Sequence, residues 1–236
     1  MTLFSRLKSA LDVLASLAVL VAAIALCWTL FARGTVTGGA PPTRGGAIDV
    51  DHLEFLPGKN ANSRGNGKLV VVEFADYQCP FCGSYARETF PQVERELIAP
   101  GLVTYIFRHF PLEAIHPLAF RASEAAECAA EQGRHWELHE RLFSQPMALT
   151  PVDLVNHARG AEIDLTEFDK CLTGGSKASL VRSHMDEGTR LGVSGTPAFF
   201  FGRVESDGSI RLMKRVNGSL SFSLFKGTLD AVASSN

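Results

Sequence analysis

Short apolar runs and amphipathic segments alternate along most of the chain. Residues 69–75 form an apolar, β-branched run that predicts a buried strand. A helix is predicted over 80–98, with a kink at Pro91, and residues 102–107 predict a second strand. Two strands joined by a long helical crossover are typical of a parallel pair, so the pattern predicts an α/β core.

The second half of the chain departs from this alternation. Residues 116–191 are predicted to be wholly helical, because Ala, Glu and a repeating apolar stripe dominate them. Two strands follow at 198–204 and 210–216, joined by a turn that contains an Asp-Gly pair, and 222–232 predicts a last helix. The pattern therefore predicts an α/β domain with a helical insertion in its middle.

The N-terminal segment has a different pattern. Residues 13–32 are twenty residues without a charge, long enough to cross a bilayer as a helix. Arg6 and Lys8 precede this segment and favour a cytoplasmic N-terminus, which would place the rest of the chain outside the cytoplasm. A cleaved signal peptide is the alternative, but residues 30–32 offer a poor cleavage site. Cys27 is interpreted as an apolar side chain buried among membrane lipids.

These patterns divide the chain into four parts. Residues 34–46 are rich in Gly, Pro and Thr, as in a flexible tether, and a short strand is possible at 48–55. The predicted organisation is a signal anchor or transmembrane helix at 1–33, a linker at 34–66, a core formed by 67–112 and 192–236, and a helical insertion at 113–191.

Composition narrows the class of protein further. The 236 residues are 46% hydrophobic and 20% charged, as in a globular protein. The formal net charge is −2, and no block rich in Lys and Arg is present. The chain therefore lacks the electrostatic footprint of a nucleic-acid-binding protein, and no nucleic-acid partner is predicted.

The sequence Cys79-Pro80-Phe81-Cys82 lies where the first strand leads into the first helix. This position places the Cys79 sulfur beside unpaired backbone N–H groups and the positive end of the helix dipole, which favour a thiolate. Cys82 is one turn along the same face and can attack a mixed disulfide formed by Cys79. The pair is therefore predicted to exchange a disulfide, with no cofactor beyond the two cysteines.

Two other features invite a metal interpretation. His135 and His139 are spaced i, i+4 and could bind zinc from one face of a helix. No Glu follows His135 directly, so the metalloprotease pattern is missing, and one Cys-x-x-Cys supplies only half of a four-cysteine site. Both histidines are interpreted as structural, and no metal site is predicted.

Three motifs together resemble the bacterial DsbA family of thiol-disulfide oxidoreductases. They are Glu73-Phe74-x-x-x-x-Cys79-Pro80-Phe81-Cys82, the segment from Phe107 through His116-Pro117 to Cys128, and Gly192-Val193-Ser194-Gly195-Thr196-Pro197. The resemblance covers roughly residues 68–232. It implies a thioredoxin-like fold with an inserted all-helical subdomain, preceded here by one N-terminal transmembrane helix.

The resemblance also implies roles for individual residues. Pro197 matches the cis-proline of the family, and Thr196 before it would pair with an extended substrate, although a proline at this point could also be a simple sheet-edge residue. Pro80 and Phe81 are assigned to the same substrate-binding face. Glu73 matches a buried acid that relays a proton to Cys82, although strand alternation also allows an exposed side chain.

Cys128 and Cys171 lie in the predicted helical insertion, and four of the five cysteines follow the predicted membrane segment. Disulfides persist outside the cytoplasm, and an even number of cysteines allows two pairs. Some members of the DsbA family carry a second disulfide in this subdomain, which implies a structural Cys128–Cys171 bridge. Two buried free thiols are the alternative.

The predicted function is the introduction of disulfides into exported proteins, at the outer face of the cytoplasmic membrane or in the periplasm. Reduced or unfolded proteins would be the substrates, and the resemblance implies that a membrane quinone-linked oxidase reoxidises the cysteine pair. Phe81 cannot donate a hydrogen bond to Cys79, so a less extreme oxidant is expected. A tethered reductase, an isomerase and a non-catalytic binding or chaperone module are the alternatives.

Overall fold

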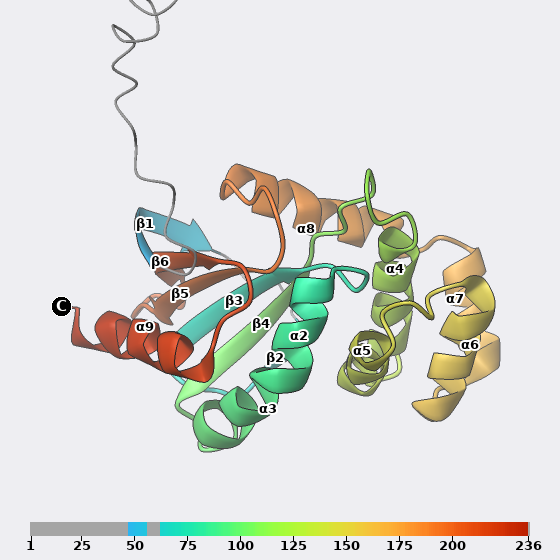
Figure 1. Ribbon diagram of the computed structural model, residues 1–236, viewed down its shortest axis with the longest axis horizontal. Helices are drawn as coiled ribbons and strands as arrows, with labels where there is room; N and C mark the ends of the chain where they lie inside the picture. The colour runs from blue at the N-terminus through green and yellow to red at the C-terminus, as the bar shows by residue number, and fades with distance from the viewer. Residues whose placement is uncertain (1–46, 56–61, 236) are drawn as a thin grey trace, which may run out of the picture. The chain divides into compact units, whose positions relative to one another are not determined.

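A six-stranded mixed sheet forms the centre of the domain, in the order β1-β6-β5-β3-β4-β2. The computed structural model describes residues 47–55 and 62–235, apart from the side chains of 51–54. The strands are β1 (Ile48–Phe55), β2 (Asn62–Arg64), β3 (Leu69–Ala75), β4 (Val103–His109), β5 (Ala198–Val204) and β6 (Ile210–Asn217). Figure 1 shows β3 and β4 in the middle of the domain, where each carries the chain toward the start of α2.

The predicted parallel pair and C-terminal hairpin are both confirmed. β3 and β4 run parallel, with Val71 opposite Tyr105 and Glu73 opposite Phe107. β5 and β6 are antiparallel, and Gly208 in their connecting turn has a φ of 86°, which favours glycine. β5 also pairs antiparallel with β3, and this pairing brings the C-terminal half of the chain beside the first strand.

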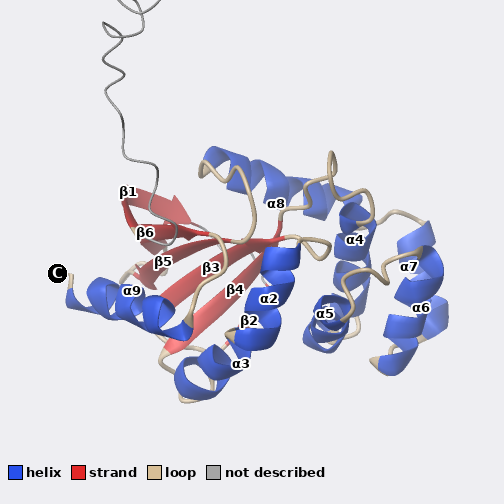
Figure 2. Cartoon of the chain, viewed as in Figure 1, coloured by secondary structure: helices blue, strands red, loops and turns tan. Residues whose placement is uncertain are grey.

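The helices lie mainly between β4 and β5 in the sequence. They are α2 (Pro80–Glu88), α3 (Phe90–Val93), the π-helix η1 (Glu94–Ile98), α4 (Ala119–Ala130), α5 (His135–Ser144), α6 (Pro151–Gly160), α7 (Leu165–Thr173), α8 (Ala178–Arg190) and α9 (Phe222–Ser234). The predicted helical character of the insertion is confirmed, as Figure 2 shows by secondary structure.

The prediction of one kinked helix over 80–98 is wrong in detail. The first helix ends at Thr89, and a short turn of α-helix and a π-helical turn continue it. Pro91 has no N–H to donate and its ring clashes with the carbonyl four residues earlier, so the regular helix ends before it. The Thr89 hydroxyl stabilises the chain at this break, because it donates a hydrogen bond to the Leu220 carbonyl at 2.7 Å.

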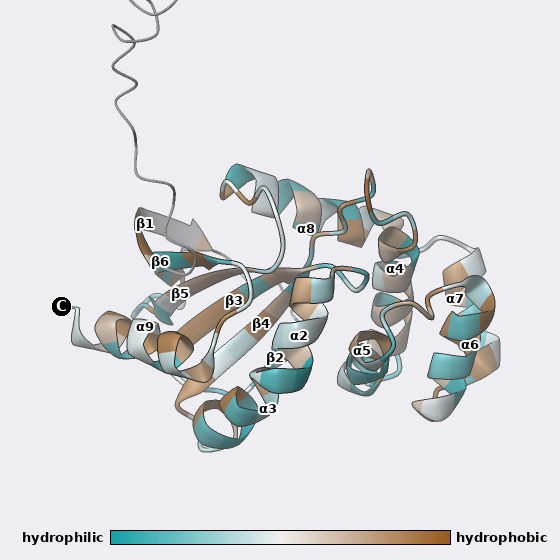
Figure 3. Ribbon diagram, in the orientation of Figure 1, coloured by the Kyte–Doolittle hydropathy of each residue, from teal (hydrophilic) through white to brown (hydrophobic). Residues whose placement is uncertain are grey.

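The two faces of the sheet are covered by different helices. One face carries Tyr105 and Phe199, which pack with residues of α2 and α9. The other face carries Phe74, which lies under α8. Gly188 permits the close approach of α8, since a Cβ there would lie 2.7 Å from the Phe110 ring. In Figure 3 the central strands are hydrophobic, as expected for strands buried on both faces.

The insertion contains a disulfide and most of an apolar core that it shares with the end of β3, the cysteine turn and β4. Large buried side chains from α5, α6 and α7 fill this core, among them Leu142, Phe143, Leu154 and Phe168. Cys128 of α4 and Cys171 of α7 are bonded, with an S–S distance of 2.01 Å. The insertion therefore packs as a helical layer that also touches α2 through α5.

Two strands lie in the range predicted as linker. The possible strand at 48–55 is confirmed as β1, and β2 is a strand that the sequence did not indicate. They form the two edges of the sheet, β1 beside β6 and β2 beside β4. The predicted transmembrane segment at 13–32 lies outside the described residues. Across the described parts, 47–55 and 62–235, every helix is too short or too polar to cross a membrane.

Candidate redox site

The cysteine pair lies where β3 passes into α2. β3 ends at Ala75, a short turn follows, and Cys79 is the N-cap residue of the helix. The Cys79 N–H donates to the Asp76 carbonyl at 3.1 Å, and the Cys79 carbonyl accepts from the Gly83 N–H at 3.1 Å. These bonds hold the Cys79 sulfur at the open N-terminus of α2, where N–H groups lack intrahelical partners.

Asp76 organises this turn, and the sequence analysis did not single it out. The side chain is fully buried. Its Oδ1 accepts from the Gln78 N–H at 2.7 Å, and its Oδ2 accepts from the Leu112 N–H at 2.8 Å and lies 2.8 Å from His116 Nδ1. Asp76 thus ties the cysteine turn to the loop after β4. The only available signal was an acid placed directly after a buried strand.

The cysteines differ in accessibility and face the loop before β5. Both are free thiols, with 3% of Cys79 exposed and none of Cys82. The Cys79 thiol donates to the Thr196 carbonyl oxygen at 3.4 Å, and the Thr196–Pro197 peptide bond is cis. The structure therefore brings the predicted cysteine pair beside the predicted Thr196–Pro197 pair, which lies more than a hundred positions later in the sequence.

The electrostatics distinguish the two thiols. Hydrogen bonds from the Cys82 thiol, the Thr196 side chain and backbone N–H groups of α2 lower the pKa of Cys79 to about 6, against an opposing effect of burial. Burial and the neighbouring Cys79 sulfur raise the pKa of Cys82 well above its usual range. At neutral pH Cys79 is therefore a thiolate and Cys82 a thiol.

Glu73 is buried in the sheet and hydrogen-bonded to tyrosine. Only 3% of it is exposed, so the alternative of an exposed strand residue is wrong. The Tyr105 hydroxyl donates to Glu73 Oε2 at 2.6 Å, and the Tyr85 hydroxyl lies 3.2 Å from that of Tyr105. Burial raises the pKa of Glu73 to about 8, with the Tyr105 hydrogen bond lowering it and the charge of Cys79 raising it.

Tyr105 is a second contributor that the sequence analysis missed. Tyr105 lies opposite Val71 in the parallel pair of β3 and β4. Two residues later on β4, Phe107 lies opposite Glu73. Side chains two positions apart on a strand share a face, so Tyr105 and Glu73 meet diagonally across the two strands. The register of β3 and β4 would have been needed to find it.

The remaining predicted substrate-facing residues line the opening. Pro80 is exposed and Phe81 presents 63% of its surface, while Pro197 is buried and Thr196 is partly exposed. An exposed apolar side chain thus follows Cys79 closely in sequence, and the Thr196–Pro197 loop that leads into β5 lies at the cysteine sulfur. This arrangement suits a short extended peptide that carries a thiol.

The two histidines interpreted as structural are indeed packed in the insertion. His135 Nδ1 lies 3.4 Å from the Ala126 carbonyl oxygen, and His139 Nδ1 lies 3.2 Å from the Tyr77 hydroxyl. The His139 ring also meets the Phe107 ring edge-on, with centroids 4.7 Å apart. These contacts place both side chains in the core between the sheet and the insertion.

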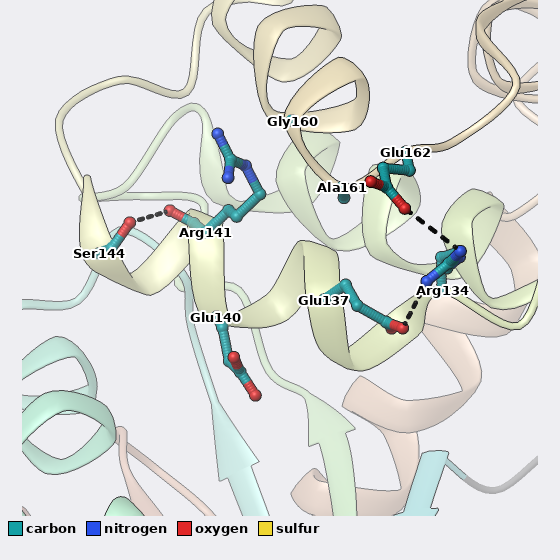
Figure 4. A pocket seen from close by; sticks show the side chains of 8 residues that line it. All are labelled: Arg134, Glu137, Glu140, Arg141, Ser144, Gly160, Ala161 and Glu162. Atoms are coloured by element: carbon teal, nitrogen blue, oxygen red, sulfur yellow. Dashed lines mark hydrogen bonds and ion pairs between the residues drawn. The ribbon is translucent and has the colours of Figure 1, made fainter.

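A hollow of about 330 Å³ lies between α5 and α6, away from the cysteines. Figure 4 shows its charged lining, in which Arg134 pairs with Glu137 at 3.1 Å and with Glu162 at 3.7 Å. Charges that pair with one another at the surface contribute little to stability or binding. We assign this hollow no role.

Comparisons with known proteins agree with this fold. The profile of the family described as Thioredoxin matches residues 64–214, so the chain belongs to that family. Curated relatives include Na(+)/H(+) antiporter NhaA 3 of Salinispora tropica, 40% identical over 132 residues, which are 56% of this chain and 20% of the antiporter. NhaA 1 of Mycolicibacterium gilvum is 32% identical over 188 residues, 78% of this chain and 29% of the antiporter. The chain thus spans less than a third of the length of these relatives.

Solved structures share the whole arrangement of core and insertion. BdbD from Bacillus subtilis superposes with a TM-score of 0.65 at 21% identity, covering 79% of this chain and all of BdbD. α-DsbA1 of Wolbachia pipientis gives 0.63 at 20% identity, with 75% and 92% covered. A thioredoxin-like oxidoreductase from Silicibacter pomeroyi gives 0.63 at 23%, with 76% and 95% covered. The chain thus shares the thioredoxin-like fold of these DsbA-like structures, and it carries two free cysteines, Cys79 and Cys82, at the start of α2.

Proposed function

We propose that this protein introduces disulfides into exported proteins by thiol-disulfide exchange at Cys79 and Cys82. One observation carries the proposal: the Cys79 sulfur faces the carbonyl of Thr196 at a cis-proline, and its pKa is lowered to about 6. A stabilised thiolate favours the dithiol form of the enzyme, so the disulfide form gives up its oxidising equivalents readily.

The reaction starts from the oxidised Cys79–Cys82 pair. A substrate thiolate attacks Cys79 Sγ, a bond forms between substrate and Cys79, and the Cys79–Cys82 bond breaks with its electron pair on Cys82. A second substrate thiolate then attacks the substrate sulfur of this mixed disulfide, and Cys79 leaves as a thiolate. Two substrate thiols are oxidised to one disulfide, and the enzyme holds the two electrons as a dithiol.

Glu73 supplies the proton that the first step needs. Cys82 leaves as a thiolate inside the core, where its raised pKa makes the charged form unfavourable. Glu73, with a pKa of about 8, holds a proton at neutral pH. Loss of that proton to Cys82, directly or through one water, removes the buried sulfur charge, and reoxidation reverses the transfer.

The cellular setting is part of the same proposal. The uncharged segment 13–32 would anchor the chain in the cytoplasmic membrane, with the domain in the periplasm or extracytoplasmic space. A quinone-linked membrane oxidase would return the dithiol to the disulfide. The exposed Phe81 lacks the donor that would further stabilise the Cys79 thiolate, which supports an oxidant of moderate strength.

Oxidative refolding of a reduced substrate protein tests the proposal. The oxidised protein should restore the substrate's disulfides, and Cys79→Ser should abolish this activity. Cys82→Ser cannot form the Cys79–Cys82 disulfide and should also lose this activity. When it is given a substrate that already holds a disulfide, its Cys79 thiolate should displace one substrate sulfur and remain as a mixed disulfide, because the resolving thiol is missing. A potential for the Cys79–Cys82 pair as low as about −270 mV, that of thioredoxin, would indicate a reductase and contradict the proposed direction.

A further inference from the structure

Three potential metal ligands converge in the core on the side of the domain where the sheet meets the insertion. They are His109 at the end of β4, Glu127 of α4 and His184 of α8. One ligand atom from each lies within 4.8 Å of the others, and all three side chains are buried. His109 Nε2 lies 2.7 Å from Glu127 Oε1, and the rings of His109 and His184 stack with centroids 5.5 Å apart.

This cluster has unused nitrogen atoms. His109 Nδ1 and His184 Nδ1 are buried without a hydrogen-bond partner, and so is Nε2 of the adjacent His135. An imidazole nitrogen that is buried without a partner loses its hydration and gains nothing in return. Packing alone does not explain why three unpartnered imidazole nitrogens lie around the Glu127 carboxylate. A cation bound at this carboxylate would give imidazole nitrogens a partner.

We propose that His109, Glu127 and His184 bind a divalent transition-metal ion of the zinc class. Two imidazole nitrogens and one carboxylate oxygen form a donor set typical of zinc, whereas calcium and magnesium prefer oxygen ligands alone. Ligand atoms around tetrahedral zinc are about 3.4 Å apart, given Zn–N distances of about 2.1 Å. Small side-chain rotations from the present spacing of up to 4.8 Å would close the site.

A neighbouring side chain outside the three proposed ligands also holds Glu127 in position. Asn62 of β2 donates from Nδ2 to Glu127 Oε1 at 2.6 Å, and such a bond orients a ligating carboxylate. His109 and Asn62 belong to the sheet, and Glu127 and His184 belong to helices packed against it. A metal ion here would therefore fasten the helical insertion and α8 to the sheet. This role is structural and independent of the exchange reaction at Cys79.

The experiment must exclude metal bound by the redox cysteines, so it uses the full-length C79S/C82S protein in detergent. Co²⁺ is added to metal-free protein and its visible absorption is followed, then Zn²⁺ is added in competition. We expect one equivalent of Co²⁺ with the intense bands of four-coordinate cobalt and no sulfur-to-cobalt charge transfer, displaced by Zn²⁺. Zn²⁺ should also raise the melting temperature of this protein.

Substitution of one proposed ligand should weaken metal binding. In the same background His184→Gln should lower Co²⁺ affinity at least about 100-fold, because loss of an outer-shell partner alone costs 10-fold to 100-fold. His157→Gln is the matched control, since His157 is a buried histidine of the insertion whose Nε2 bonds the Ala148 carbonyl at 2.9 Å. The Co²⁺ affinity of His157→Gln should equal that of the parent.

Two results would overturn the proposal. One is the lack of saturable Co²⁺ uptake by the C79S/C82S protein, which needs no ligand variant and so does not depend on how the variants fold. The other is equal uptake by His184→Gln and the parent, with both folded by circular dichroism. If His184→Gln does not fold, Glu127→Gln replaces it, and equal Co²⁺ uptake by that variant and the parent would again overturn the proposal. In that case X-ray absorption of the parent must also show imidazole ligands to the metal.

Discussion

The Tyr105 hydroxyl donates a 2.6 Å hydrogen bond to Glu73 Oε2 inside the core, between two parallel strands. This bond alone would lower the pKa of Glu73, yet burial outweighs it and raises the pKa to about 8. Tyrosine thus holds the carboxyl group in one orientation while burial keeps its proton available. The charge of Glu73 raises the pKa of Cys82, so the protonation of the carboxyl group and that of the resolving thiol depend on each other.

Glu73→Gln should slow disulfide exchange, because glutamine keeps the volume but cannot release a proton. We expect the second-order rate constant for oxidation of a thiol peptide to fall about 100-fold at pH 7, the low end of general acid catalysis. Stopped-flow measurement over pH 5 to 9 checks this and should show that the variant loses the titration near pH 8. Glu124→Gln, at a buried acid of the insertion paired with Arg121, is the control. Equal rates for Glu73→Gln and the parent would rule out the relay.

The same glutamate should make the stability of the reduced protein depend on pH. Its pKa is about 4.5 in the unfolded chain and about 8 when folded, so the folded state binds the extra proton between these values. This contribution is fully present below pH 4.5 and is lost as the pH rises through about 8. The free energy of unfolding of the parent, relative to Glu73→Gln, should therefore fall by a few kcal/mol over that interval. Urea titrations of both reduced proteins at several pH values measure the difference, and a flat difference would contradict it.

Parts of this site could be read from the sequence and parts could not. Cys79 and Cys82 were found because a strand, a helix start and a fixed spacing are all local features. Thr196 and Pro197 depended on family resemblance, since no local rule places them against Cys79. Tyr105 depended on the register of two strands, and register is set by the whole sheet.

Two details of the fold could not be predicted for the same reason. β2 is only three residues long and polar, so its pairing with β4 is visible only once β4 is in place. The sequence placed a kink at Pro91, but the helix breaks at Thr89. A proline disrupts the helical turn that precedes it, so the break comes two residues before the proline. The convergence of His109, Glu127 and His184 was invisible for a further reason: the three residues lie on three separate elements.

The nucleophile should titrate near pH 6. The rate of Cys79 alkylation by iodoacetamide should rise with a midpoint at about this pH, because only the thiolate reacts. Thr196→Val removes the side-chain hydroxyl that helps to lower the pKa of Cys79 and should move the midpoint to higher pH. Thr104→Val is the control, since its hydroxyl bonds the Gly67 carbonyl at 2.7 Å. A midpoint that stays the same in Thr196→Val would mean that the hydroxyl does not stabilise the thiolate.

The thiolate and the glutamate should act on stability in opposite directions. The Cys79 thiol titrates at about 9.0 when unfolded and at about 6 when folded, so its stabilising contribution is present above pH 9 and is lost as the pH falls through 6. Comparison of the reduced parent with Cys79→Ser isolates this effect. The parent should gain stability relative to the variant between pH 6 and 9. The oxidised parent, in which neither cysteine titrates, is the control.

The Cys128–Cys171 disulfide should contribute strongly to stability. It closes a loop with a sequence separation of 43, for which the chain-entropy relation gives about 4 kcal/mol. Cys128→Ala/Cys171→Ala should lower the free energy of unfolding by about this amount in urea, with the Cys79–Cys82 pair kept reduced in both proteins. Exchange activity of the folded variant should remain, because the disulfide lies in the insertion away from the cysteine turn. A loss below 1 kcal/mol would contradict the prediction.

Phe81 should limit the oxidising strength of the pair. Its side chain is 63% exposed and offers no donor to Cys79, so Phe81→His can be accommodated and adds a cationic donor at acidic to neutral pH. Greater stabilisation of the thiolate favours the reduced form, and each tenfold change in the exchange equilibrium is worth about 30 mV for a two-electron couple. Equilibration with glutathione should therefore show a higher potential for Phe81→His by about 30 mV for each unit by which the Cys79 pKa falls. Phe81→Leu, which adds no donor, should leave the potential unchanged, and an equal rise in both variants would show that the aromatic ring itself, and not the missing donor, sets the potential.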